Sequence, residues 1–220
     1  GLSTRSLHTL RVAFSRPRLY FEAAQHPDWL GVYAPSFRLW LALVAVISLF
    51  QFFWAGSDSA TLANTIAQLE ASNNIPEHVD TVALAEQYNQ WSFGLLPACL
   101  ALCLLGLAAI YPQPGYRGNF AMCQRALFIT IIPGTALSVV VTISLGITPD
   151  DRYWQVLGGS YALSLLADGW TAFRGADPER ALSARLSHAL LFAAAILLTS
   201  FCAGLLSNLG ASAAIRLLLV

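Results

Sequence analysis

Five apolar stretches, each close to the length that a helix needs to cross a bilayer, constrain this chain more than any other feature. A hydrocarbon core about 30 Å thick takes roughly 20 residues of helix. Stretches of this kind occupy residues 37–55, 91–111, 126–147, 154–173 and 187–206. The fourth is the weakest candidate because it contains Asp168. We therefore expect an all-α fold, a multi-pass transmembrane helical bundle of five spans.

The positive charges predict how these spans are oriented. All 12 basic residues are arginine, a composition typical of a GC-rich bacterial genome. Ten of them form three clusters: Arg5, Arg11, Arg16, Arg18 and Arg38; Arg117 and Arg125; Arg174, Arg180 and Arg185. Residues 56–90, between the first two clusters, contain acidic residues and no arginine. Because short basic loops stay in the cytoplasm, we expect the bacterial inner membrane, a cytoplasmic N-terminus and a periplasmic C-terminus.

Residues 1–35 form the first of two expected regions, a cytoplasmic interfacial segment. Leu7, Leu10 and Phe14 recur at helical spacing, and Pro17 interrupts the run. Apolar residues on one face and arginines on the other are typical of a helix lying in the membrane plane. The expected membrane-surface contacts are Arg5, Arg11, Arg16 and Arg18. The alternative is an amphipathic helix that packs on its own bundle.

Residues 36–220 form the second region, the membrane domain, with an extracytoplasmic insertion at 56–90. A first helix carrying Leu62, Ile66 and Leu69, and a second starting at Pro76, predict a helical hairpin there. Residues 207–220 are too short to span, so we expect them at the outer interface.

Asp168 is the sharpest candidate for a functional side chain. A charged group within a span is costly, so such groups usually face the bundle interior and have partners. His188 lies at a similar depth in the next span, which predicts an Asp168–His188 hydrogen bond with Tyr161 nearby. This intramembrane polar site would serve a proton or ion; the alternatives are a structural polar lock or an acid that meets Arg174 at the interface.

Pro97 and Pro133 interrupt two spans. Paired helix breaks can mark the binding site of a transporter. Counting from the span ends places the two prolines at different depths, so we interpret them as separate kinks.

The remaining motifs assign no catalytic, cofactor-binding or metal-binding residue. A single histidine lies within the spans, which is too few for a bis-histidine haem. Cys99 and Cys103 share a helix face but lack further ligands for a metal. The net charge of zero gives no basis for nucleic-acid binding. With no hydrolase or nucleotide-binding motif either, we expect neither an enzyme nor a resident cofactor.

The order of motifs resembles an uncharacterised bacterial inner-membrane family, a domain of unknown function with five predicted spans. The resemblance rests on Leu7-His8-Thr9-Leu10, on Ser15-Arg16-Pro17 and on Tyr33-Ala34-Pro35-Ser36-Phe37-Arg38-Leu39 before the first span. Pro114-Gly115-Tyr116-Arg117 matches the basic loop between the second and third spans. Many members begin with a zinc ribbon of paired cysteines, which this sequence lacks. The resemblance implies a topology and no activity.

These observations favour a non-catalytic accessory, scaffold or assembly subunit of a larger inner-membrane complex, respiratory or photosynthetic. Its partners would be the lipid bilayer and other proteins of the complex. One alternative is a small transporter, channel or lipid-handling protein that uses Asp168. Another is a membrane sensor or regulator with the arginine-rich N-terminus as its output face.

Overall fold

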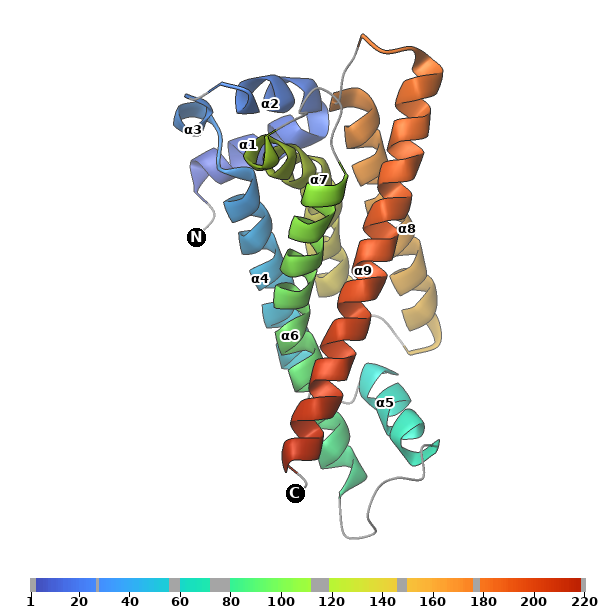
Figure 1. Ribbon diagram of the computed structural model, residues 1–220. Coiled ribbons are helices and arrows are strands. Elements are labelled where there is room, and N and C mark those ends of the chain that lie inside the picture. Colours follow the sequence, from blue (N-terminus) through green and yellow to red (C-terminus); the bar gives the residue numbers. More distant parts are fainter. Residues whose placement is uncertain are drawn as a thin grey trace.

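The computed structural model describes residues 3–26, 28–55, 60–71, 80–111, 119–145, 150–175 and 179–218 (Figure 1). Within these ranges the protein is all α-helical, with eight helices of at least eight residues and one single turn, α3. The five long helices are α4 (Ser36–Ala55), α6 (Thr81–Ile110), α7 (Phe120–Leu145), α8 (Asp150–Gly175) and α9 (Leu182–Leu218). They run alongside one another and alternate in direction (Figure 1).

Four segments of these helices are long and apolar enough to cross a membrane: Trp29–Phe52, Thr81–Ile110, Phe120–Leu145 and Leu182–Leu217. The prediction of a multi-pass helical membrane protein is thus confirmed. The helix α8 is not among them, because acidic residues, arginines and glycines lower its hydropathy. It nevertheless packs against both α7 and α9 and lies beside them in the bundle (Figure 1).

The helix α7 contributes more buried residues to the core than any other helix. Its residues from Ala126 to Gly134 are all buried, whatever side of the helix they occupy. The rings of Trp40 from α4 and Phe128 from α7 meet with centroids 4.9 Å apart. Because a helix buried on every side must be apolar all round, this half of α7 forms the axis about which the other helices pack.

The N-terminal helices α1 (Thr4–Ser15), α2 (Pro17–Ala24) and α3 (Trp29–Val32) lie across the end of the bundle where α8 ends (Figure 1). We call these three helices the N-terminal cap. Pro17 begins α2, as expected from its fixed φ and missing N–H. Ala34, which follows the cap in the sequence, connects α1 to α2. Its backbone N–H donates to Thr9 Oγ1 of α1 at 2.9 Å, and its carbonyl accepts from the hydroxyl of Tyr20 of α2 at 2.8 Å. Burial raises the pKa of the Tyr20 hydroxyl, with a smaller contribution from Tyr33, so this donor keeps its proton.

The cap packs on its own bundle, against α7 and α8. The buried face of α1 consists of Thr9, Val12 and Ala13, whereas Leu7 and Phe14 are exposed. Leu10, the third member of the apolar stripe singled out in the sequence, is half-buried and packs against the core, so the stripe points only partly toward the bundle. Small residues let α1 approach α7 closely, which the larger leucine and phenylalanine side chains would prevent.

The insertion at 56–90 differs from the expected pair of separate helices. Its first helix is α5 (Ala60–Ala71), which packs against α6. The second is the beginning of α6 itself: Asp80 caps Thr81–Ile110 at its N-terminus, and the helix then continues into the span without a break. Residues 72–79, with Pro76, lie outside the described residues. Thr65 of α5 donates to Asn89 of α6 at 2.9 Å and ties the hairpin together.

The last helix does not end with the fifth predicted span, because α9 continues unbroken to Leu218. At 1.5 Å per residue, its 37 residues measure about 55 Å. The far end of α9 runs along the first turns of α6, where Ser92 donates to Asn208 at 2.7 Å. A Cβ at Gly210 would lie 2.8 Å from Leu95, so glycine permits this close approach. Packing against α6 supplies the stability that the short segment alone would lack.

A candidate binding cavity around Asp168

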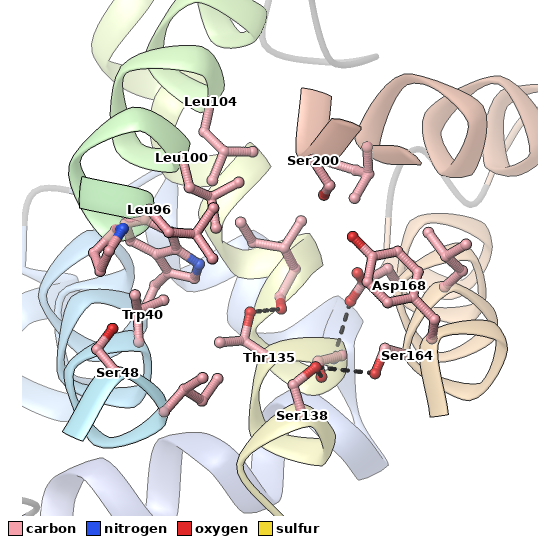
Figure 2. Close-up of a pocket in the computed structure, with 18 of the residues that line it drawn as sticks. Trp40, Ser48, Leu96, Leu100, Leu104, Thr135, Ser138, Ser164, Asp168 and Ser200 are labelled. Atoms are coloured by element: carbon pink, nitrogen blue, oxygen red, sulfur yellow. Dashed lines mark hydrogen bonds between the residues drawn. The ribbon is translucent and has the colours of Figure 1, made fainter. Parts of the chain in front are cut away.

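A cavity of about 190 Å³ lies within the bundle, and all five long helices contribute to its wall (Figure 2). We call it the inner cavity. Its polar wall residues are Ser48, Gln51, Thr135, Ser138, Tyr161, Ser164, Asp168 and Ser200. Trp40, Leu96, Leu100 and Leu104 are among its apolar residues. Trp40 and Ser48 lie on one side, opposite Asp168 and Ser164 (Figure 2).

Asp168 of α8 is 5% exposed and borders the inner cavity. Its carboxylate Oδ1 accepts a hydrogen bond from the backbone N–H of Gly134 at 2.9 Å. Pro133 immediately precedes this glycine and interrupts the hydrogen-bond ladder of α7. A Cβ on residue 134 would overlap the carboxylate of Asp168. The close contact between α7 and α8 therefore depends on glycine at this position.

Hydroxyl groups continue the polar wall away from Asp168. Ser138 and Ser164 join α7 to α8, with their oxygens 3.1 Å apart. Ser138 also lies 3.0 Å from the carbonyl of Gly134, and Thr135 donates to Ile131 at 2.8 Å. Both side chains thus bond to the carbonyl four residues earlier in α7, a common arrangement for serine and threonine within helices.

Asp168 is the acidic residue of this wall, and none of the residues that line the cavity is basic. The site therefore offers a hydrogen-bond acceptor that can carry negative charge, together with neutral hydroxyls. Such a set suits a proton, a small cation or a ligand with N–H donors. The described residues include no group of three side chains that could hold a metal ion.

His188 does not join Asp168 as the sequence analysis expected. Its Nδ1 lies 3.1 Å from the hydroxyl of Tyr111 on α6, and the two rings stack with centroids 5.8 Å apart. The reason is the packing of α9 along α6, which turns this histidine toward Tyr111. Equal depth in two spans does not fix the direction of a side chain. Tyr161, by contrast, borders the inner cavity with Asp168.

The two prolines within helices, interpreted as separate kinks at different depths, lie near one cavity. Pro97 of α6 and Gly134, next to Pro133 of α7, both border the inner cavity. Counting residues from the ends of the spans does not account for helix offset along the bundle. Both prolines were identified from the sequence, but not their position near the same cavity.

The four arginines predicted to contact the membrane surface differ in their contacts within the protein. Arg5 donates to the carbonyl of Leu30 at 3.1 Å, and Arg18 forms an exposed ion pair with Glu22 at 2.6 Å. Arg11 and Arg16 are exposed. All four therefore lie on the accessible surface of the cap, where contact with lipid headgroups stays a prediction.

Two further arginines hold helix ends together. Arg125 of α7 donates to the carbonyl of Ala24 at 3.4 Å and lies 5.4 Å from the centre of the Trp29 ring. Arg185 of α9 donates through Nε and Nη2 to the carbonyl of Phe173, at 3.1 and 2.6 Å. It thereby satisfies a carbonyl in the last turn of α8, where helices leave acceptors without intrahelical partners.

Comparison with known proteins adds no relative to this picture. No family model, no curated protein and no solved structure matches the chain. The proposed function therefore rests on the geometry of the inner cavity.

Proposed function

We propose that this protein is a small transporter that binds its cargo at Asp168 in the inner cavity. The observation that carries the proposal is a carboxyl group, 5% exposed, on the wall of a cavity bounded by five helices. Ionisable residues inside membrane helices are expensive and commonly mark substrate or ion pathways. A purely structural acid would not require a cavity beside it.

Prolines inside two of the helices support the same proposal. A proline has no N–H, so it leaves one carbonyl of the preceding turn without its usual donor while the helix continues. Pro97 of α6 and Gly134 of α7, which follows Pro133, border one cavity from two different helices. A proline within a helix also gives α6 and α7 a point about which a segment can tilt.

A five-span topology in a bacterial inner membrane is part of the proposal, with α8 as the additional span. The alternating directions of the five long helices support it (Figure 1). Arg125, Arg174 and Arg185 lie at the end of the bundle that carries the N-terminal cap, which favours that end as the cytoplasmic one.

A pair of C-terminal fusions tests the topology. We expect alkaline phosphatase, which is active in the periplasm, to be active, and a cytoplasm-dependent fluorescent protein to be dark. Four spans would place both termini on one side and reverse the two results. The same reporters fused after residue 25 serve as the control for the cytoplasmic side.

Transport is tested with the purified protein in liposomes on a solid-supported membrane. Rapid exchange of protons, alkali cations and small organic amines should evoke a current for at least one of them.

Asp168→Asn should abolish this current, since asparagine keeps the size of the side chain and the acceptor for Gly134 and removes the charge. Glu86→Gln, a matched change outside the cavity, should keep it. Folding is checked by size-exclusion chromatography and circular dichroism. The proposal would be refuted if Asp168→Asn kept the current of the parent protein, or if the parent protein gave no current.

An accessory subunit is the second candidate. The far ends of α6 and α9 support it, because the 55 Å length of α9 exceeds a bilayer core of about 30 Å. Val82, Leu209 and Leu217 are exposed on these extensions, where a partner protein would bury them. Mass spectrometry of material purified in mild detergent distinguishes the candidates: stoichiometric partners support a subunit, and the chain alone supports the transporter.

A further inference from the structure

A second hollow lies beside the inner cavity, between α4 and α6. Its volume is about 390 Å³, and we call it the lateral hollow. Its wall is apolar apart from the hydroxyl of Ser48, and it includes Leu49 and Phe52 of α4 and Phe93 and Gly94 of α6. Its chemistry therefore contrasts with that of the cavity that contains Asp168.

The two hollows adjoin each other. Val44, Ser48 and Pro97 border both of them. Gly94, three residues before Pro97, has no side chain, and nothing lies within 4 Å of the position its Cβ would take. The wall of the lateral hollow is therefore open at this point of α6, next to the residues that it shares with the inner cavity.

The lateral hollow faces the lipid side of the bundle. Leu49 and Phe52 on its rim are 55% and 54% exposed, and both belong to a candidate span. In a bilayer these side chains meet hydrocarbon. A hydrocarbon chain could therefore enter the lateral hollow from the membrane without passing through water.

We propose that the cargo is an amphiphile with a positively charged amine head group, which enters sideways between α4 and α6. The head group lies against Asp168 in the inner cavity, and the hydrocarbon chain occupies the lateral hollow. This inference rests on the proposed function and names its substrate class.

Charge and size select this class. The inner cavity has an acid and no basic residue on its wall, so it complements a cation and lacks a partner for a phosphate. Trp40, on the opposite wall, adds an aromatic ring to the lining, and aromatic rings attract ammonium groups. At about 190 Å³ the cavity is below the roughly 300 Å³ at which pockets begin to take drug-sized ligands. It fits a head group, and the chain must lie elsewhere.

The test measures equilibrium binding of two radiolabelled probes, tetramethylammonium and dodecyltrimethylammonium, to the intact protein in lipid nanodiscs. Empty nanodiscs give the background from partition into lipid. The variants are Asp168→Asn for the head-group site and Gly94→Trp for the lateral hollow. Gly106→Trp is the matched control, since it lies on α6, has open space around its Cβ and borders neither hollow.

We expect the dodecyl probe to bind at least about tenfold more tightly than the tetramethyl probe, because burial of each CH₂ is favourable. Gly94→Trp should remove this chain-length advantage and leave tetramethylammonium binding unchanged, whereas Gly106→Trp should change neither. Asp168→Asn should weaken both probes by about tenfold or more.

Other outcomes overturn the inference in distinguishable ways. Equal binding of both probes, or equal effects of Gly94→Trp and Gly106→Trp, would overturn lateral entry and leave a transporter for small cations. Binding of neither probe, together with an Asp168-dependent current in liposomes, would exclude amines as the cargo class and keep the proposed function. Binding of neither probe, with no such current, would overturn both.

Discussion

The two halves of α7 differ sharply, and the difference separates the framework of this protein from its candidate site. From Ala126 to Gly134 the helix is buried on all sides, at the level of the N-terminal cap and its arginine contacts. Beyond Gly134 most of its residues are half-buried or exposed, and the hydroxyls of Thr135 and Ser138 border the inner cavity. Dense packing at one end fixes the helices, so a cavity can persist where they are less tightly joined.

The two halves also use polar groups differently. At the cap end, Arg125 and Arg185 reach across to carbonyls of other helices. Along the cavity wall, Thr135 bonds to a carbonyl of its own helix, and the short hydroxyl of Ser138 meets that of Ser164 on α8. The first arrangement stabilises the fold, whereas the second keeps a site polar without closing it. Substitutions in each half should therefore have separable effects on stability and binding.

Gly134→Ala should have the largest effect, because this residue lies at the boundary between the halves. The new methyl group would overlap the carboxylate of Asp168, and we expect the free energy of unfolding to fall by about 3 kcal/mol, the upper part of the range for overpacking. The free energy of unfolding is measured by reversible unfolding in mixed micelles.

A double-mutant cycle sharpens this prediction. In an Asp168→Ala background the overlapping atoms are gone, so Gly134→Ala should cost little there. Gly158→Ala is the matched control, since no atom lies within 4 Å of its Cβ position. Equal costs of Gly134→Ala in both backgrounds would show that the contact with Asp168 does not constrain this position.

Arg185→Met should have an intermediate effect, confined to stability. It removes two charged hydrogen bonds to the carbonyl of Phe173 and the contact of the guanidinium with that ring at 4.5 Å. We expect a loss of about 2 kcal/mol in the same unfolding assay, with amine binding unchanged. Arg16→Met, on the exposed face of the cap, should stay within about 0.5 kcal/mol of the parent protein. A binding defect in Arg185→Met would break the proposed separation between framework and site.

Ser138→Ala should have the smallest effect on stability. It removes the contact with Ser164 between α7 and α8, and hydrogen bonds between membrane helices average about 0.6 kcal/mol. Ser144→Ala is the control, because Ser144 also donates to a carbonyl of α7 but does not border the cavity. A cost of several kcal/mol for Ser138→Ala would mean that the cavity wall is itself part of the framework.

The sequence predicted the long helices because span length and hydropathy are local properties. The first span was expected at 37–55 and the second to end at 111, and the helices run to Ala55 and Ile110. The sequence analysis treated the end of the insertion and the second span as separate helices, whereas α6 runs through both. Asp80 caps this helix, which continues past Gly94 and Pro97 to Ile110.

The site was predictable only in part. Asp168 stood out because an acid in an apolar stretch is anomalous whatever the fold. Its partner Gly134 was not identified, since a backbone N–H gives no signal in a sequence and glycine has no side chain. The pairing of His188 with Tyr111 depends on how α9 is rotated against α6, and long-range packing sets that rotation. The convergence of Pro97 and Pro133 depends on the same packing.

The uninterrupted length of α9 has a mechanical consequence. The helix is one stiff rod from Leu182 near the cap, past Ser200 at the inner cavity, to Leu218 beyond it. A stiff rod transmits torque and displacement along its whole length. A load on its far end, where Ser92 donates to Asn208, would therefore also displace the wall of the cavity, so that motions of the α5–α6 hairpin and of the bundle interior are coupled.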